Sequence, residues 1–350
     1  MSRTRMLLVS MYPLDRGLWG PTVRITHLRD ALLHRVDLDL VDGYRGARRL
    51  ALARYATSGR LRGLDGIYVE TSTFLPAETD LVFLGLARSL GIPVLTYVRD
   101  AYQLFDDYGP ATTARQRAAR AAFRPMIRAL RAVSSRMAFP TIGLAEAVLG
   151  AGGADAVLLP PGSPPPIEVA ADPDANRLLF VGDARLSAQG ADRLIEAVAR
   201  ARNDGAAVGL TVVCRPGQEP PQPHPDWLRI ERAEGDAIAV LLPDVVATVI
   251  PRPRNAYNDL ALPIKLFDYL AYGRPLLVTD CTEQAAVVKR AGAGVVMGDD
   301  PKAMAAAIRR VADAPEKQRQ AWSASAHEAA RDASWEHRAQ HIVDIIRDRT

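Results

Sequence analysis

One stretch of the chain, residues 262–280, concentrates side chains that could bind a phosphorylated ligand. Pro263 suits the first turn of a helix, where its missing N–H costs nothing, and Gly273 suits the end of that helix. The helix would hold Lys265 and Asp268 within one turn of its N-terminus, where the dipole and free N–H groups favour a phosphate. Lys265 adds a positive charge for a diphosphate, and Asp268 can accept hydrogen bonds from ribose hydroxyls. From the residues alone, an amphipathic helix whose Lys and Asp face water fits equally well.

Acid–base chemistry has its best candidate in Asp100, which follows the strand-forming residues 93–98. Parallel sheets bind ligands at the carboxyl ends of their strands, so this carboxylate could accept a hydrogen bond or a proton from a substrate hydroxyl. Glu70, at the end of the strand-forming residues 66–70, is a second and weaker candidate. A structural alternative is that Asp100 caps the next turn or pairs with its neighbour Arg99.

A glycine-containing loop, residues 17–22, follows the first apolar run and precedes a helical segment. Such a loop allows the backbone to approach a ligand, and Gly20 is its candidate contact. Because the full Gly-x-Gly-x-x-Gly pattern is missing, a dinucleotide site is a weak interpretation. A plain turn between a strand and a helix fits the loop equally well.

These candidates need a scaffold, and the hydrophobic pattern predicts one of alternating strands and helices. Short apolar runs alternate with helix-period segments, which is typical of strand–helix–strand units around parallel sheets. The predicted strands are residues 6–10, 38–41, 67–70, 94–98, 157–159, 178–181, 210–214, 245–250, 275–279 and 294–297. The predicted helices are residues 23–34, 80–90, 114–137, 188–202, 263–272, 283–292, 302–313 and a last helix after Ser334.

Residues 160–166 contain five prolines and cannot continue a helix or a central strand. They predict a division between an N-terminal Rossmann-like domain, residues 1–160, and a linker, residues 161–176. A second such domain, residues 177–330, and a closing helix, residues 331–350, follow. The predicted fold is therefore α/β, with two Rossmann-like doubly wound domains facing a cleft.

The composition argues against several classes of protein. Cys214 and Cys281 are too few for a disulfide framework or a thiolate metal site, and the six histidines show no metal-ligand spacing. No stretch approaches the roughly 20 apolar residues of a membrane span. The short apolar run after Arg5 lacks the cleavage site of a signal peptide. We therefore expect a cytoplasmic protein without a bound metal.

Positive charge is concentrated in the first half of the chain. Residues 1–170 carry 21 arginines and 15 acidic residues, whereas residues 171–350 carry 23 basic and 25 acidic residues. Residues 114–137 contain seven arginines and no acidic residue, and helical spacing gathers five of them in one stripe: Arg117, Arg120, Arg124, Arg128 and Arg131. Such a helix can rest on an anionic membrane surface, although Pro125 would kink or divide it. The alternative is a helix that packs on the core and exposes its arginines to water. Binding of nucleic acid is not expected, because no nucleic-acid recognition module accompanies the arginines.

Residues 262–280 resemble the donor-site signature of GT-B glycosyltransferases, especially the retaining family 4, glycosyl transferases group 1. Members commonly read Leu-Pro-x-Lys-x-x-Glu-Tyr-x-Ala-x-Gly-x-Pro before a buried strand, and this chain departs only in having Asp268 for Glu. The likeness extends over most of the second half, from the strand before Gly182, through Gly190, to the helix after Ser334. The first half matches more loosely.

This resemblance implies a GT-B fold, a nucleotide-diphosphate sugar as co-substrate, and no metal or other cofactor. The donor-binding candidates are Gly20, Gly182, Arg185, Pro263, Lys265, Asp268 and Glu283. The catalytic candidates are Asp100 and Asp259, which would face the acceptor and the sugar. The family favours retention, in which the donor phosphate takes the proton and Asp100 positions the acceptor. In an inverting reaction Asp100 would be the base.

Two departures from the family pattern keep other functions open. The family usually carries Arg directly after the glycine at position 182 and Lys directly before the glycine at position 190. This chain has Asp183 and Gln189 there. The predicted function is sugar transfer to a hydroxyl of a saccharide, lipid-linked or small-molecule acceptor. A lipid-linked acceptor would suit peripheral association with the inner membrane face. The alternatives are a non-catalytic GT-B binding or partner protein with a weakened donor site, and a sugar-nucleotide epimerase.

Overall fold

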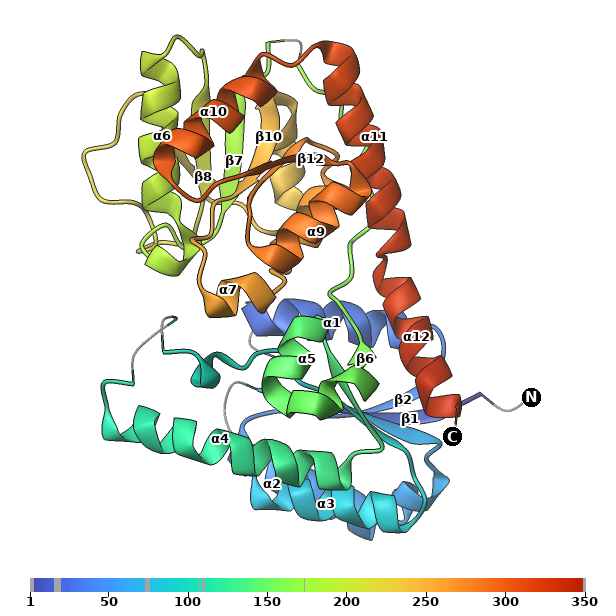
Figure 1. Ribbon diagram of the computed structural model, residues 1–350. Coiled ribbons are helices and arrows are strands. Elements are labelled where there is room, and N and C mark those ends of the chain that lie inside the picture. Colours follow the sequence, from blue (N-terminus) through green and yellow to red (C-terminus); the bar gives the residue numbers. More distant parts are fainter. Residues whose placement is uncertain are drawn as a thin grey trace. The chain divides into compact units, whose positions relative to one another are not determined.

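The computed structural model describes residues 3–15, 20–72, 76–106, 108, 111–172 and 174–348, and it divides into two compact units (Figure 1). The first unit combines the chain up to Gly162 with its end from Trp335 onward, and the second unit is Ser163–Ser334. The division after Gly162 falls within the proline-rich residues 160–166. The last helix, predicted as a closing element, belongs to the first unit.

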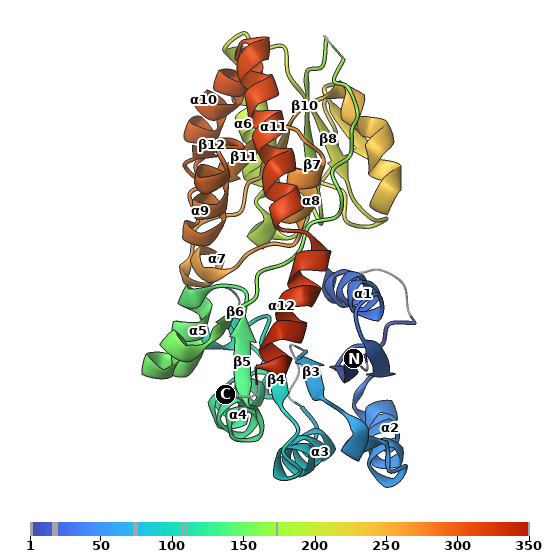
Figure 2. The same ribbon diagram turned by 90° about the vertical axis from the view of Figure 1, so that its right-hand side faces the viewer.

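The first unit is built on a six-stranded parallel sheet with the strand order β2-β1-β3-β4-β5-β6. Its strands are β1 (Arg5–Ser10), β2 (Asp37–Val41), β3 (Gly66–Glu70), β4 (Val94–Tyr97), β5 (Arg136–Phe139) and β6 (Val157–Leu158). Its helices are α1 (Gly20–Leu33), α2 (Arg45–Thr57), α3 (Glu78–Ser89), α4 (Ala114–Val133), α5 (Ile142–Leu149) and α12 (Trp335–Arg347). Figure 2 shows α1, α5 and α12 on one face of this sheet and α2, α3 and α4 on the other.

Alternation along β1 shows why this sheet is covered on both faces. Met6 and Leu8 pack into the apolar cluster under α1 and α12, whereas Leu7 and Val9 pack into the cluster under α2 and α3. Successive strand residues point to opposite faces, so a continuous apolar run needs helices on both sides.

The second unit repeats this plan with the strand order β12-β11-β10-β7-β8-β9, again parallel throughout the described pairings. Its strands are β7 (Arg177–Val181), β8 (Gly209–Val213), β9 (Leu228–Glu231), β10 (Val245–Ile250), β11 (Leu276–Thr279) and β12 (Gly294–Met297). Its helices are α6 (Ala191–Asn203), α7 (Ala256–Leu260), α8 (Lys265–Ala271), α9 (Thr282–Ala291), α10 (Pro301–Ala312) and α11 (Glu316–Asp332). One apolar cluster lies under α6 and α10, and the other under α8 and α11.

The structure confirms the predicted α/β class with two Rossmann-like, doubly wound sheets, but it corrects several elements. The prediction of one helix over residues 114–137 is wrong, because α4 ends at Val133 and β5 begins at Arg136. The edge strand β9 and the helices α2, α5, α7 and α11 were also not predicted. Arg229 is exposed within β9, and this polar edge weakens the apolar signal of a strand.

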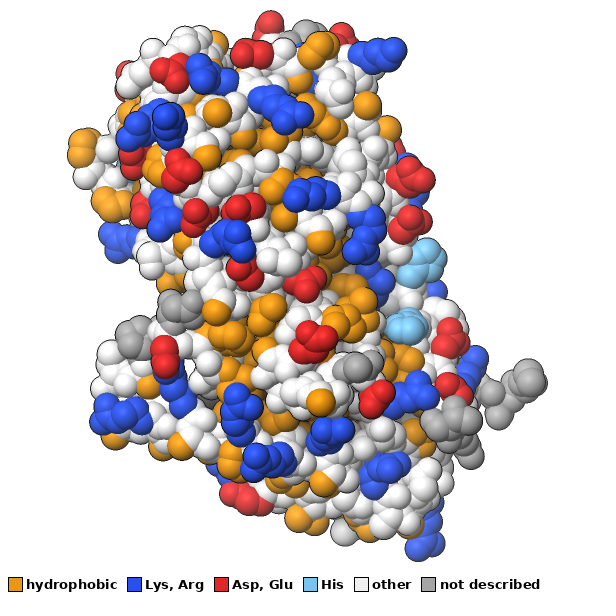
Figure 3. All heavy atoms as spheres, viewed as in Figure 1, with side chains coloured by type: hydrophobic (Ala, Val, Ile, Leu, Met, Phe, Trp, Pro, Cys, Tyr) orange, Lys and Arg blue, Asp and Glu red, His pale blue; other side chains and the backbone are white. Residues whose placement is uncertain are grey.

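Pro125 does not divide α4, which runs unbroken through it. Helix α4 buries Phe123, Ile127 and Leu130, and Figure 3 shows basic side chains in a row along it. None of the helices in the described ranges is long and apolar enough to cross a membrane.

A buried ion pair ties α2 to α3 in the first unit. The Nε and Nη2 atoms of Arg48 donate to the two carboxylate oxygens of Asp80 at 2.7 and 2.6 Å. Asp80 also accepts from the N–H of Ala77 at 2.6 Å, and Arg48 donates to the carbonyl of Gly43 at 2.6 Å. Glu78, two residues before Asp80, pairs with arginines of α2 on the exposed surface.

We expect Asp80→Asn to lower the free energy of unfolding by about 3 kcal/mol, because it leaves the Arg48 charge buried without a counter-charge. Urea denaturation followed by circular dichroism measures this loss. Glu78→Gln removes a carboxylate from the same helix at an exposed pair and should change stability little. Equal effects of the two substitutions would contradict the buried-pair interpretation.

Candidate functional site

The second sheet has a topological switch point between β7 and β10. The chain leaves β7 for β8 and β9 on one side, then crosses to β10 on the other side. The loops after β7 and β10 therefore separate at the carboxyl ends of these strands. Open α/β sheets bind their ligands in the crevice formed there.

Lys265, the first residue of α8, brings its ammonium to the end of β7. Its Nζ donates to the carbonyl oxygen of Val181 at 2.8 Å and to Oε1 of Gln189 at 2.6 Å. It also lies 5.0 Å from the centre of the Phe180 ring. An ammonium carries three N–H donors, and these two oxygens are the acceptors that the described residues provide.

Two glycines allow the loop after β7 to reach this position. A Cβ at Gly182 would lie 2.8 Å from the Nζ of Lys265. Gly190 has a φ of +73°, and a Cβ there would lie 1.9 Å from the carbonyl oxygen of Pro251. The loop after β7 can therefore touch both the ammonium and the loop after β10 only with glycine at these positions.

Arg252, which follows β10, is a second cation at this site that sequence reasoning missed. Its buried guanidinium donates to Oδ1 of Asn258 and to the carbonyl of Ala261. Its charge contributes to lowering the pKa of Lys265, so the two cations are close enough to interact. Neither cation forms an ion pair with an acidic residue in the described part of the chain. The site thus offers two positive charges to an anion.

Burial moves the pKa values of Lys265 and Asp268 toward neutrality. Loss of hydration, with a contribution from Arg252, lowers the pKa of Lys265 from 10.5 to about 7. Burial likewise raises the pKa of Asp268 from 3.8 to about 7. The Lys265 shift costs stability below pH 7, and this cost disappears as the pH rises toward 10.5. The Asp268 shift costs stability above pH 7, and this cost disappears as the pH falls toward 3.8.

The Asp268 carboxylate lies close enough to Lys265 for its charge to raise the pKa of the ammonium, against the larger effect of burial. It lies one helical turn after Lys265 and is partly exposed. Among the described residues, its side chain has no hydrogen-bond partner. It is therefore available to accept hydrogen bonds from a ligand.

The start of α8 differs from the predicted helix over residues 263–272. The N–H groups of Leu266 and Phe267 already donate to the carbonyls of Pro263 and Ile264, at 3.1 and 2.9 Å. The first turn is therefore tightened, and fewer free N–H groups remain for a phosphate than the sequence suggests. Pro263 acts here as a carbonyl acceptor that closes the turn.

Arg185 is not brought to the Lys265 ammonium. Its exposed guanidinium donates through Nε to the carbonyl of Glu219 at 3.2 Å. Its backbone N–H donates to the carboxylate of Asp183 at 2.9 Å, so the two loop residues hold each other in a turn. Gln189, in contrast, accepts directly from Lys265.

Asp259 is already occupied by a neighbouring arginine. Arg254 donates to its two carboxylate oxygens at 2.9 and 3.2 Å, and the N–H of Thr282 at the start of α9 lies 3.3 Å away. Glu283 follows in the first turn of α9 and is partly buried. The pairing of Asp259 with Arg254 neutralises the carboxylate that the sequence assigns to the sugar.

In the first unit, the carboxylate of Asp100 lies 2.6 Å from Nε of Arg99, which is the structural alternative that the sequence left open. Glu70 is fully buried and paired with Arg24 at 3.1 Å, and it also accepts from the hydroxyl of Tyr68 at 2.6 Å. This pairing gives Glu70 a structural role in the core.

Gly20 is the first residue of α1, and a Cβ there would meet no atom within 4 Å. Residues 17–19 of the predicted ligand loop lie outside the described residues. Across the described ranges, no three His, Cys, Asp or Glu side chains gather into a metal-binding group.

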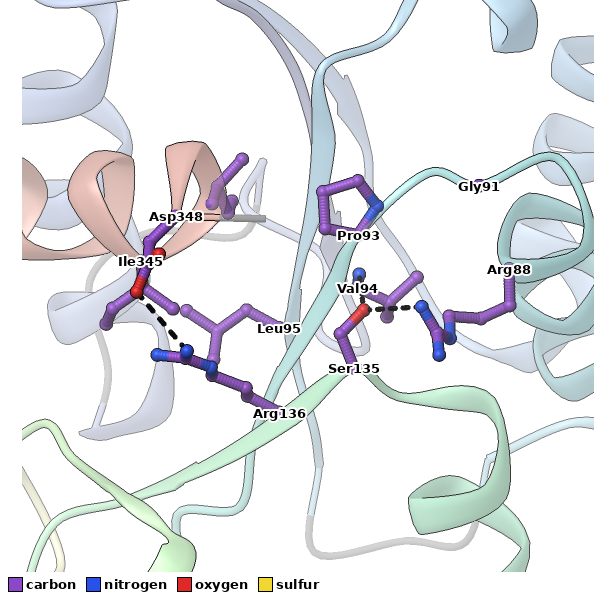
Figure 4. Close-up of a pocket in the computed structure, with 10 residues that line it drawn as sticks. Arg88, Gly91, Pro93, Val94, Leu95, Ser135, Arg136, Ile345 and Asp348 are labelled. Atoms are coloured by element: carbon purple, nitrogen blue, oxygen red, sulfur yellow. Dashed lines mark hydrogen bonds and ion pairs between the residues drawn. The ribbon is translucent and has the colours of Figure 1, made fainter. Parts of the chain in front are cut away.

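A pocket of the first unit lies at the amino ends of the strands β4 and β5, away from the carboxyl ends where such sheets bind their ligands (Figure 4). Arg88 donates to the hydroxyl of Ser135 at 2.9 Å, and Arg136 pairs with Asp348 at 3.3 Å. None of the predicted site residues lines this pocket.

Residues 175–314 match the model of the family described as Glycosyl transferases group 1. The matched segment lies within the second unit and contains the loop after β7, Arg252 and α8. None of the curated proteins matches the sequence. Sucrose-phosphate synthase from Thermosynechococcus elongatus has a similar structure, with a TM-score of 0.67 at 14% identity over 99% of this chain and 98% of that chain. The fold is that of the GT-B glycosyltransferases.

Two further solved structures have this GT-B fold. A glycosyltransferase from Rickettsia africae gives a TM-score of 0.68 at 9% identity, over 100% of this chain and 99% of that one. The E. coli structure described as trehalose-6-phosphate bound with UDP-2-fluoro glucose gives 0.65 at 11% identity, over 98% and 99%. At these identities the likeness shows the fold alone. Together with the family match in the second unit, it supports a GT-B glycosyltransferase.

Competitive acetylation should find Lys265 reactive near pH 7, because burial lowers the pKa of its ammonium to about 7. An amine in a lysine peptide has a pKa of about 10.4 and needs a much higher pH. The chain has four lysines, so Lys289, Lys302 and Lys317, all exposed, serve as references in one mass-spectrometric measurement. If Lys265 required as high a pH as these references, the buried environment described above would be wrong.

Proposed function

We propose that this protein transfers a sugar from a nucleotide-diphosphate sugar to the hydroxyl of an acceptor. The observation that carries the proposal is the pair of cations, Lys265 and Arg252, at the switch point of the second sheet. This pair lies within the segment that matches Glycosyl transferases group 1. A diphosphate is the leaving group that two unpaired cations at such a position suit best.

Each site residue has a role in this proposal. Lys265 and Arg252 bind the diphosphate. Gly182 and Gly190 leave room for it because they have no Cβ. Asp268 accepts hydrogen bonds from the ribose. The bond between the anomeric carbon and the diphosphate oxygen breaks, its electron pair stays on that oxygen, and the two cations stabilise the developing charge. The acceptor oxygen then forms the new bond to the anomeric carbon.

The similar E. coli structure supports a nucleotide sugar as donor, because it is described as bound with UDP-2-fluoro glucose. The pKa of Lys265 adds a physical argument. A diphosphate beside its ammonium would replace lost hydration with an opposite charge and raise that pKa again. Part of the binding free energy would therefore come from relieving the cost of the buried charge.

Thermal-shift titration against a panel of nucleoside diphosphates tests the donor site. One of them should stabilise the wild type, and Lys265→Met or Arg252→Met should weaken its binding. Loss of one charge-assisted hydrogen bond is worth about 2 kcal/mol, which is roughly thirtyfold in Kd. Lys289→Met removes an exposed lysine from the same unit and should leave the Kd unchanged.

A second candidate function, a non-catalytic binding or partner protein, is favoured by Asp183 and Gln189, which replace basic residues of the family pattern. The titration tests donor binding, and an assay of turnover is needed to test catalysis. If no nucleoside diphosphate stabilised the wild type, the proposed donor site would be refuted and the non-catalytic function preferred. Binding without turnover of any nucleotide sugar would also favour the non-catalytic function.

We propose retention of the anomeric configuration, with the proton of the acceptor hydroxyl passing to the departing phosphate oxygen. The pairing of Asp100 with Arg99 supports this, because the ion pair already occupies the carboxylate that an inverting reaction would need as its base. An α-linked donor should then give an α-linked product, as seen in the proton NMR spectrum of the product. A β-linked product would overturn retention and make Asp100 the candidate base.

A further inference from the structure

The outer surface of α4 carries positive charge that the acidic residues in the described ranges leave largely unpaired. This helix holds six arginines and no acidic residue. Arg120 is paired with Asp106. Four others are exposed and form no ion pair with the described acidic residues: Arg117, Arg124, Arg128 and Arg131.

These four arginines, called here the arginine row, share one side of the helix. At 100° per residue they fall within about 60° of each other, and they extend over roughly 21 Å of the helix axis. Phe123, Ile127 and Leu130 anchor the neighbouring side of α4 in the core. The anchored helix therefore holds the row in a fixed line.

The adjoining helices add exposed aliphatic side chains to this layer. Helix α3 packs beside α4 and exposes Val82 at 72%, together with Leu86, and Leu90 directly after α3 is exposed as well. Helix α2, which packs beside α3, exposes Leu50 at 62%. The helical layer on this face of the sheet thus combines the unpaired arginine row with exposed aliphatic side chains.

We propose that the α2–α3–α4 layer docks on a lipid bilayer that contains anionic phospholipids. Charge complementarity argues for this partner, because a basic helix face is attracted to phosphate and carboxylate headgroups. The exposed aliphatic side chains argue for a bilayer over a nucleic acid. They can enter the boundary between headgroups and acyl chains, whereas a nucleic acid backbone would leave them in water.

Cosedimentation of the whole protein with vesicles tests this surface. We expect binding to phosphatidylcholine vesicles that contain about 30% phosphatidylserine, and much weaker binding to phosphatidylcholine alone. Replacing the arginine row by glutamine should weaken binding at least about a hundredfold, since each basic side chain near such a surface contributes roughly fivefold.

A matched variant removes four positive charges from the second unit. The residues chosen are exposed and form no ion pair with the described acidic residues. The variant replaces Lys289, Lys302, Arg290 and Arg310 with glutamine. Its vesicle binding should stay within about threefold of the wild type if the row, and not the net charge, is responsible. Circular dichroism melts of both variants check that each is folded.

The aliphatic part of the surface has its own test. Val82→Asn combined with Leu86→Asn should remove most of the binding that persists at about 0.5 M salt, where charge attraction is screened. Both side chains are exposed, so the variant should remain folded.

Three outcomes would overturn the proposal. They are no binding of the wild type to anionic vesicles, equal losses in the row variant and the matched variant, and tighter binding to polyglutamate or duplex DNA than to vesicles. Vesicle binding needs no sugar transfer. A failure here would therefore leave the donor-site proposal intact, and a failed nucleotide titration would leave this one intact.

Discussion

The hydrogen bond from the Lys265 ammonium to the carbonyl of Val181 is the contact on which the candidate site depends. It joins the first residue of α8, on one face of the second sheet, to the last residue of β7. Gly182 leaves the space that this contact needs, because any Cβ there would come within 2.8 Å of the ammonium. The close approach of the loop at Gly190 then brings Gln189 to the same nitrogen.

The electrostatics of the site follow from the kind of oxygen around that ammonium. Val181 and Gln189 offer neutral acceptors, which satisfy two N–H groups without supplying a negative charge. Arg252 adds a second cation, and burial lowers the pKa of the ammonium to about 7. A desolvated site with two positive charges binds an anion more strongly than an exposed one, because solvent screening is weaker. Gln189, where the family usually has Lys, thus serves to hold Lys265 in place.

The first unit uses arginine in two different ways. Arg24 and Arg48 are buried against Glu70 and Asp80, where the planar guanidinium forms several fixed hydrogen bonds. The arginine row of α4 instead remains on the surface. Part of the arginine richness is therefore structural, and only the exposed part is available to a partner.

The sequence by itself determined the α/β class, most of the strands, and the placement of Lys265 and Asp268 within one helical turn, because these depend on local periodicity and on spacing within one helix. It could not find Arg252, which meets Lys265 only because β10 pairs with β7 in the sheet order. A signal was nevertheless present, since an arginine between two prolines directly follows a buried strand.

Tertiary structure also decided which partners Asp259, Arg185 and Glu70 have. Their partners, Arg254, the Glu219 carbonyl and Arg24, are set by loop paths and side-chain packing that no spacing rule contains. A charged residue that the fold leaves unpaired is the one most available to a ligand. Whether a residue is left unpaired depends on which distant segments the sheet order brings together.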